Sequence, residues 1–214
     1  GVVHTFKSMA WGVTSATRRV RMDANDRYIS YLPLAHVAER MLIEQGALRY
    51  GGRIFFAEAL DTFVQDLQRA RPTLFISVPR LYVKFQQGVF AKMPPAKLDR
   101  LLSIPILGKL VGKKVRKGLG LDQVKLAGSG SAPIPADLID WYRRIGLPLY
   151  EGYGMTEDNS YSHTSTPDHH APGYVGVAMP GVEVKISAQG EILIKSPARL
   201  TGYYKQPELD AESF

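Results

Sequence analysis

The chain has 214 residues, of which 45% are hydrophobic and 22% are charged, and its formal net charge is +7. That composition is typical of a globular protein with a sizeable core. There is no cysteine, which excludes disulfides, cysteine nucleophiles and cysteine-ligated zinc, and no apolar run reaches the roughly 20 residues that cross a bilayer. The first residues lack a secretory pattern, so we expect a cytoplasmic protein.

Strands and helices are predicted to alternate through most of the chain. The short apolar runs bounded by Gly or Pro predict strands over residues 28–32, 53–57, 73–78, 123–127 and 148–151. Apolar residues at helical spacing predict helices over residues 37–49, 60–70, 79–91 and 135–145. This alternation predicts an α/β fold, with a doubly wound, mostly parallel sheet that carries helices on both faces.

The last fifth of the chain has a different pattern. Residues 182–187 alternate between apolar and polar side chains, and residues 191–195 follow after Ala188, Gln189 and Gly190. This spacing predicts an antiparallel hairpin with one wet and one packed face. We therefore expect a helical lead-in over residues 1–27, a doubly wound subdomain over residues 28–165, and a small antiparallel portion, part of a barrel, over residues 166–214.

Positive charge is concentrated between Lys97 and Lys117, where seven basic side chains face one acid, Asp99. The stretch has no interleaved aromatic residues, which argues against a nucleic-acid partner. Apolar residues accompany the lysines at Ile104, Leu107, Leu110, Val111 and Val115. The segment could be a solvated or core-packed helix, or an amphipathic helix that contacts an anionic membrane peripherally or the phosphates of CoA.

Several predicted strands end in loops that carry polar or glycine-rich sequence. These loops comprise residues 33–36, 79–80, 128–133 and 152–157. The carboxyl ends of parallel strands meet at one edge of a sheet, and open α/β sheets bind ligands there. We therefore expect these loops to surround one cleft.

Two of these loops have the composition of a nucleotide site. Glycines let backbone approach a flat ligand, Tyr153 offers an aromatic face, and residues 131–133 offer a small opposing wall. Thr156 supplies a hydroxyl, and Glu157 supplies a hard oxygen ligand suited to Mg²⁺. Taken singly, each loop is also compatible with ordinary surface structure, because Pro133 interrupts the G-x-G-x-x-G pattern and an isolated acid is usually solvated.

The string from Glu151 to Glu157, E-G-Y-G-M-T-E, resembles the Y-G-x-T-E signature of the adenylate-forming (AMP-binding) superfamily. Residues 128–135 resemble the adenine-binding G-x-A-P loop of that family, with Ser131 where glycine is common. Residues 175–204 resemble its later G-E-[IL] and G-Y-[YL] segments. Residues 31–40 are similar to the L-P-L-x-H-x-x-E-R segment of its long-chain fatty acid–CoA ligases.

This resemblance implies an ATP-dependent ligase that forms an acyl-adenylate from a fatty acid and then transfers the acyl group to CoA. Glu157 would ligate Mg²⁺, Thr156 would hydrogen-bond phosphate, and His36 would lie beside the bound carboxylate. These three residues form the expected catalytic set. The expected nucleotide-binding set comprises Gly130, Ser131, Ala132, Pro133, Glu151, Gly152, Tyr153, Gly154, Met155 and Thr156.

The resemblance also implies which parts of such an enzyme lie outside this sequence. The Ser/Thr/Gly-rich phosphate loop would end at Gly1, and the T-G-D segment, the hinge and the C-terminal domain with its catalytic lysine would follow Phe214. The chain alone is thus expected to be inactive, with the missing parts of the same polypeptide as partners. For the fatty chain, Val37, Met41, Ser77, Val78 and the apolar residues from Ile104 to Val115 are candidates to line a tunnel.

Three alternatives remain open from the sequence. One is an adenylating relative that acts on aromatic or amino acids, and another is a non-catalytic module that binds a nucleotide or an acyl group. The third is a protein that works at a membrane surface through Lys97 to Lys117. The remaining histidines are interpreted as structural or loop residues: His4, His163, His169 and His170.

Overall fold

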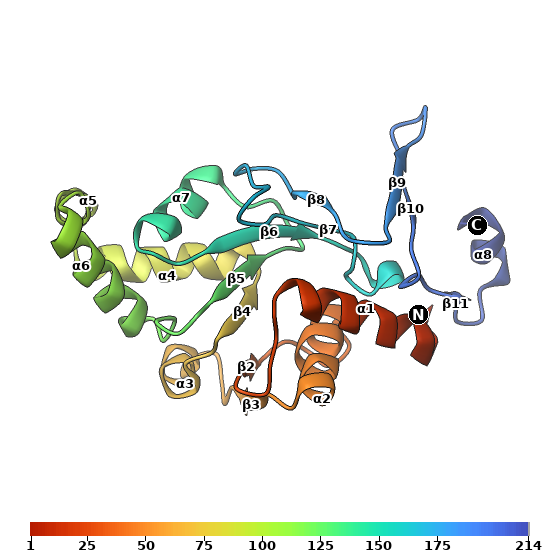
Figure 1. Cartoon of the computed structure of the whole chain (residues 1–214), viewed down its shortest axis with the longest axis horizontal. Helices are drawn as coiled ribbons and strands as arrows, with labels where there is room; N and C mark the ends of the chain where they lie inside the picture. Colours follow the sequence, from red (N-terminus) through yellow and green to blue (C-terminus); the bar gives the residue numbers. More distant parts are fainter. Residues whose placement is uncertain (214) are drawn as a thin grey trace.

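A five-stranded sheet forms the centre of the molecule in the computed structural model, which describes residues 1–213 (Figure 1). Its order is β4 (Leu74–Ser77), β5 (Leu126–Ser129), β6 (Leu149–Tyr153), β7 (His163–Thr164) and β8 (Val177–Ala178). The first three strands are parallel, and the last two are antiparallel. The predicted α/β fold with a mostly parallel sheet is confirmed.

Two further strands continue the parallel arrangement beyond β4. β2 (Arg27–Ser30) pairs in parallel with β3 (Arg53–Phe56). The N–H of Thr73 donates to the carbonyl of Arg27 at 3.0 Å, and the Tyr31 hydroxyl donates to the carbonyl of Ile76 at 2.9 Å. Hydrogen bonds at both ends therefore hold β2 beside β4, so the loop after β2 leaves the same edge as the loops after β4, β5 and β6.

Helices cover both faces of the sheet, as predicted, because neighbouring residues of each strand point to opposite sides. Ile29, Phe75 and Ala127 belong to the main core with α3 (Phe63–Ala70), α4 (Pro79–Lys92) and α7 (Ala136–Arg144). Their neighbours Tyr28, Leu74 and Leu126 point the other way, into a smaller core with Met22 and Ala47. That second face is covered by α1 (Phe6–Arg19) and α2 (Gly46–Tyr50) (Figure 1).

Local sequence signals explain several helix starts. The Thr5 side chain accepts the N–H of Ser8 at 3.0 Å and caps α1. Proline stands in the first turn of α4, of α5 (Pro95–Leu102) and of α6 (Pro105–Gly118), where its missing N–H costs nothing. The predicted helix over residues 37–49 is instead divided into a π-helix, Glu39–Gln45, and α2.

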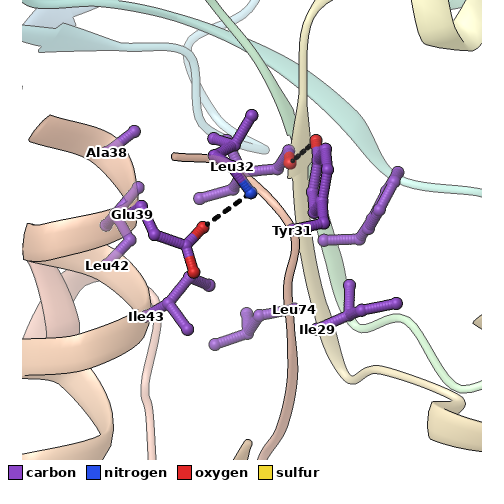
Figure 2. A pocket seen from close by; sticks show the side chains of 10 residues that line it. Ile29, Tyr31, Leu32, Ala38, Glu39, Leu42, Ile43 and Leu74 are labelled. Atoms are coloured by element: carbon purple, nitrogen blue, oxygen red, sulfur yellow. Dashed lines mark hydrogen bonds between the residues drawn. The ribbon is translucent and has the colours of Figure 1, made fainter. Parts of the chain in front are cut away.

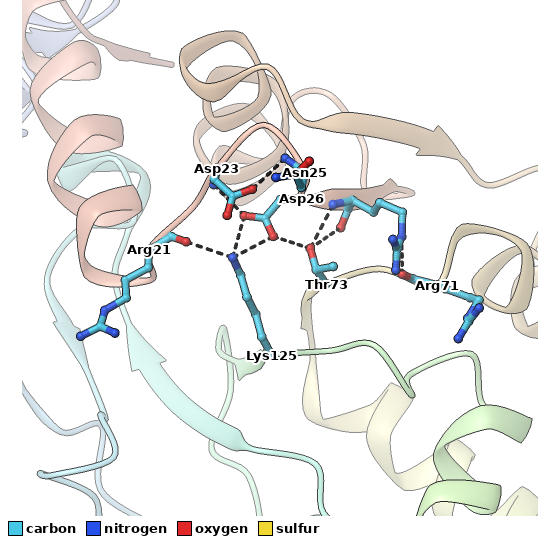
Figure 3. Close-up of polar contacts among 8 residues, drawn as sticks. Arg21, Asp23, Asn25, Asp26, Arg71, Thr73 and Lys125 are labelled. Atoms are coloured by element: carbon cyan, nitrogen blue, oxygen red, sulfur yellow. Dashed lines mark hydrogen bonds and ion pairs between the residues drawn. The ribbon is translucent and has the colours of Figure 1, made fainter.

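An ion pair between the buried carboxylate of Asp26 and the exposed side chain of Lys125 fixes the amino-terminal ends of the central strands (Figure 3). The carboxylate of Asp26, just before β2, accepts from Lys125 at 2.8 Å and from the hydroxyl of Thr73 at 2.6 Å. Lys125 also donates to the carbonyl of Arg21 at 2.9 Å. Burial raises the pKa of Asp26, but its bonds to Lys125 and Thr73 outweigh this and leave that pKa below its ordinary value. The network sets the register of β2, β4 and β5, and hence the positions of the loops at their other ends.

The carboxyl-terminal part contains the predicted hairpin, β9 (Glu183–Ile186) and β10 (Ile192–Lys195). Its expected packed face forms only in part: Val182 packs against a core cluster and Ile194 is half-buried, whereas Val184, Ile186 and Ile192 are exposed. β11 (Gly202–Tyr203) pairs with β1 (Val2–Val3), a strand that the sequence did not predict, and α8 (Pro207–Ser213) follows. Residues 1–213 form no closed barrel, and the domain limits at residues 27 and 165 stay a prediction.

No helix within residues 1–213 has both the length and the apolar character needed to span a membrane.

Candidate nucleotide and acyl site

The two glycine-containing loops lie side by side. Ser129 pairs with Glu151 across β5 and β6, so residues 130–133 and 152–153 continue from adjacent positions. A Cβ on Gly130 would lie 3.1 Å from the carbonyl oxygen of Gly152. The buried Tyr82 of α4 supports this arrangement, because its hydroxyl donates to the carbonyl of Gly128 at 3.1 Å.

The loop after β5 presents a small exposed surface. Ser131, Ala132 and Pro133 are all exposed, and Ile134 anchors the loop by its burial in the main core. Ser131 has φ +66°, a left-handed conformation that glycine adopts without a steric penalty. The serine is therefore accommodated at some cost in conformational energy, at the position where the resemblance expects glycine.

Tyr153 ends β6 instead of standing in a loop, because β7 pairs with the end of that strand. Its ring lies beside its cross-strand neighbour His163, with ring centroids 6.0 Å apart and planes inclined by 58°. Burial lowers the pKa of His163, and its Nδ1 lies 2.7 Å from the Ser162 hydroxyl. His163 was predicted to be a loop residue, and nothing in the sequence marks it as the neighbour of Tyr153.

Of the two glycines in the signature, Gly154 is required by close backbone packing and Gly152 is not. A Cβ on Gly154 would lie 2.6 Å from the backbone of Ser160, so the turn can close only with glycine at this position. A Cβ on Gly152 would meet only ordinary contact, 3.5 Å from the His163 carbonyl. The fold therefore requires Gly154 independently of any ligand.

Thr156 and Glu157 begin a short 3-10 helix, Thr156–Asp158, whose geometry Asp158 fixes. The Asp158 carboxylate accepts the N–H groups of Met155 at 3.0 Å and Tyr161 at 3.1 Å, and the residue is only 2% exposed. Burial raises its pKa. Because Asp158 turns inward, Thr156 stays exposed and Glu157 half-buried at the surface of the turn.

Both ends of the chain clamp this turn from outside. His4 Nε2 lies 2.7 Å from the carbonyl oxygen of Thr156, and Asn159 Nδ2 lies 3.2 Å from His4 Nδ1. A neutral ring that donates from Nε2 and accepts at Nδ1 satisfies both contacts. The N–H of Leu200 donates to the carbonyl of Glu157 at 2.7 Å. His4 thus has a structural duty, which ties β1 to the signature turn.

Among the residues that the structure describes, the carboxylate of Glu157 has one hydrogen-bond partner, Tyr203 on β11. The Tyr203 hydroxyl donates to Glu157 Oε1 at 3.1 Å. Burial raises the pKa of Tyr203, and the hydrogen bond to the Glu157 carboxylate raises it further. The sequence did not indicate this contact, because 46 residues separate the two side chains.

These residues fit a magnesium ion only together with a nucleotide. Within residues 1–213, no three His, Asp or Glu side chains gather into a metal site. Mg²⁺ is commonly held by one or two carboxylates with phosphate oxygens and water as its other ligands. Glu157 alone could supply that carboxylate, whereas Asp158 is committed to backbone N–H groups.

His36 lies in the loop after β2, at the same edge of the sheet. Its Nδ1 accepts the N–H of Ala38 at 3.2 Å, so a neutral ring carries its proton on Nε2. His36 is half-buried, whereas Glu39 is buried; the Glu39 carboxylate accepts the N–H of Leu32 at 3.3 Å and so anchors the loop (Figure 2). Three strand spacings separate β2 from β6, which places the two loops about 14 Å apart at about 4.8 Å per strand.

The apolar hollow below the His36 loop is small (Figure 2). It is lined by Ile29, Tyr31, Leu32, Ala38, Glu39, Leu42, Ile43, Leu74, Phe75 and Ile76. The tunnel candidates do not line this hollow: Val37 is half-buried in the His36 loop, Met41 is buried in a core cluster with Tyr161 and Met179, Ser77 is buried in β4, and Val78 is exposed. The apolar residues 104–115 belong to α6 at the far end of the molecule (Figure 1). No acyl tunnel is formed by these residues together.

Glu151 is placed differently from the other predicted site residues. Its Oε2 accepts the N–H of Gly173 at 2.8 Å, and the residue is 7% exposed. Burial raises the pKa of this carboxyl. The side chain therefore holds the loop of residues 166–174 against β6, while Met155 contributes its N–H to Asp158.

The fold and this arrangement of loops define an adenylate-forming enzyme domain, and the chain belongs to the AMP-binding enzyme family, whose model matches residues 1–204. It is 30% identical to a long-chain-fatty-acid–CoA ligase from Xenopus laevis, over 100% of this chain and 34% of that protein. It is 31% identical to a peroxisomal long chain acyl-CoA synthetase from Arabidopsis thaliana, over 99% of this chain and 35% of that protein. The chain thus spans about a third of the length of these relatives.

Solved structures agree with this assignment. ATP-bound MatB from Rhodopseudomonas palustris matches with a TM-score of 0.72 at 25% identity, over 100% of this chain and 40% of that one. O-succinylbenzoate Coenzyme A synthetase from Bacillus subtilis, in complex with AMP, matches with a TM-score of 0.74 at 19% identity, over 100% of this chain and 41% of that one. At that identity the second match supports the fold alone.

Proposed function

We propose that the intact protein is an ATP-dependent fatty acid–CoA ligase. The observation that carries the proposal is the adjacency of the loops over residues 130–133 and 152–157, with Thr156 and Glu157 held at their surface. The resemblance of residues 31–40 to fatty acid ligases supports a fatty acid as substrate, and so do the curated relatives. The reaction also requires ATP and CoA as co-substrates and Mg²⁺ as the metal ion.

In the first half-reaction a carboxylate oxygen of the fatty acid bonds to the α-phosphorus of ATP, and the bond to pyrophosphate breaks. Two anions must approach each other, so fixed positive charge and hydrogen-bond donors have to offset their repulsion. Mg²⁺ bound with the nucleotide would supply part of that charge. Glu157 would hold the ion, and the exposed Thr156 hydroxyl would donate to a phosphate oxygen.

The remaining residues would position the two substrates. Tyr153 would stack on adenine, opposite the wall formed by Ser131, Ala132 and Pro133, with Gly130, Gly152 and Gly154 admitting the backbone. His36 would donate from Nε2 to the acyl carboxylate, since its Nδ1 is occupied by Ala38. In the second half-reaction the CoA sulfur bonds to the acyl carbon, and AMP leaves.

The decisive measurement is acyl-dependent exchange of labelled pyrophosphate into ATP by the intact protein, with a panel of acids. We expect exchange with long fatty acids and little with aromatic or amino acids. The opposite preference would favour the adenylating relative. Tight ATP binding with no exchange for any acid would favour a non-catalytic nucleotide- or acyl-binding module.

A cytoplasmic location with peripheral contact to a membrane, through residues 97–117, is a separate part of this proposal. It rests on the charge and exposure of that segment and does not depend on the ligase reaction.

A further inference from the structure

Helices α5 and α6 form a hairpin at the end of the molecule opposite both termini (Figure 1). Large apolar side chains stand exposed where the chain turns from one helix into the other. The exposed fractions are 45% for Ile104, 79% for Ile106, 38% for Leu107 and 61% for Leu110. We call these four residues the hairpin tip.

The exposure of the tip follows from how α6 packs. Gly108 and Gly112 are buried, and a Cβ on either would clash with backbone, that of Leu102 or of Ile145. Val111 and Val115 pack against the main core. The inner face of α6 is therefore made of glycine and valine, and the helix cannot rotate its isoleucine and leucines inward without losing these close contacts.

Unpaired lysines continue from the tip along the outer side of α6. Lys109, Lys113, Lys114 and Lys117 are exposed, and no ion pair between described residues involves them. The helix contains no acid. Arg116 differs, because its guanidinium donates to the carbonyl of Gly146 at 2.6 Å and thus serves the fold.

These two features together identify the partner by its chemistry. CoA or another small phosphate could pair with the lysines but would leave the tip in water. An anionic bilayer satisfies both features, because its acyl boundary takes apolar side chains while its headgroups attract lysines. Resting on the peripheral membrane contact proposed above, we propose that the hairpin tip inserts into the interface of an anionic membrane, with Lys109, Lys113, Lys114 and Lys117 at the headgroups.

The test is co-sedimentation of the chain with vesicles of phosphatidylcholine, with and without 30% phosphatidylglycerol, which supplies the anionic headgroups. We expect binding to the anionic vesicles only. Salt at 0.5 M should weaken that binding, because it shortens the Debye length to a few ångströms. The double variant Ile106→Ser, Leu110→Ser and the triple variant Lys113→Gln, Lys114→Gln, Lys117→Gln should each reduce the affinity about tenfold or more.

Matched controls separate the hairpin from the overall charge. The triple variant Lys7→Gln, Lys84→Gln, Lys185→Gln removes the same charge from exposed positions elsewhere and should bind like wild type. The double variant Ile192→Ser, Leu193→Ser removes exposed apolar side chains from β10 and should also bind normally. Equal losses in the hairpin variants and in their controls would overturn the proposal.

Insertion has its own readout. Tryptophan fluorescence of Ile106→Trp should shift to shorter wavelength with anionic vesicles, whereas Leu193→Trp should not shift. A tip tryptophan that stays in water would contradict the proposal. The proposal would also be contradicted if CoA displaced the chain from vesicles while the Ile106→Ser, Leu110→Ser variant bound normally. Those two results together would indicate a small phosphate ligand.

Discussion

Glu157 is the side chain on which the proposed chemistry depends most. We expect Glu157→Ala to reduce pyrophosphate exchange by the intact protein about 10²–10³-fold, because the ion that offsets phosphate charge would lose its protein ligand. Glu191→Ala, at an exposed acid beside β10, should leave the rate unchanged. Normal exchange by the Glu157 variant would remove this residue from the site.

Tyr203 is expected to act through Glu157. Tyr203→Phe removes the hydroxyl that donates to Glu157 Oε1 at 3.1 Å, and partners of metal ligands typically change metal affinity about 10–100-fold. We expect a rise in the Mn²⁺ concentration needed for half-saturation of the ATP complex, followed by electron paramagnetic resonance. The maximal exchange rate at saturating metal should change much less, and a loss of rate alone would contradict this positioning role.

Ser131 occupies a backbone conformation that suits glycine better. Ser131→Gly should raise the free energy of unfolding by about 0.5–1 kcal/mol, because relief of the left-handed strain exceeds the added entropy of the unfolded chain. Ala132→Gly, which relieves no positive φ, should lower it by a similar amount. Urea unfolding measures both, and changes of the same sign would contradict the strain.

At the scale of elements, the Asp26–Lys125 pair holds the strand ends. Asp26→Asn should lower the free energy of unfolding at pH 7 by about 1–3 kcal/mol, because the buried acceptor of the Lys125 and Thr73 hydrogen bonds loses its charge. Asp140→Asn, at an exposed position of α7, should have little effect. Thermal unfolding of both variants checks this.

The same pair has a defined pH dependence. The folded-state pKa of Asp26 lies below its ordinary value, so its contribution is fully present above the unfolded-state pKa of about 3.9. It is lost as the pH falls through the lower folded-state pKa. The stability difference between wild type and Asp26→Asn should therefore shrink below about pH 4, and a constant difference would contradict the ionic contribution.

The elements also show where sequence patterns suffice. The strand pattern predicted β2 to β6, because strands of a parallel sheet are buried on both faces. Such strands read as short apolar runs rich in β-branched and aromatic residues and bounded by Gly or Pro. It did not predict β1, whose two residues pair with β11 some 200 positions away. It began β5 three residues too early. Val124 is apolar because it is buried in the core, although it lies before the strand, which begins at Leu126.

At the scale of the whole molecule, exposed apolar surface accompanies a chain that spans about a third of its relatives. Phe6, Leu48, Phe56 and Leu60 are each largely exposed. We expect purified chain, given palmitate, ATP, Mg²⁺ and CoA, to form no acyl-CoA above a no-enzyme control in a mass-spectrometric assay. The intact protein should form it under the same conditions, and product from the chain alone would show that the remaining parts are dispensable.

The sequence by itself determined the family, the wound sheet and the residues of the signature turn, because these depend on local order and on strand periodicity. The tertiary structure decided which side chains that turn recruits. His4, Leu200 and Tyr203 reach Thr156 and Glu157 only because β1 and β11 pair beside them. It also decided that Ile106, Leu107 and Leu110 of α6 face water, since buried glycines fix the rotation of that helix. Contacts of this kind depend on close packing between distant segments, which no local pattern encodes.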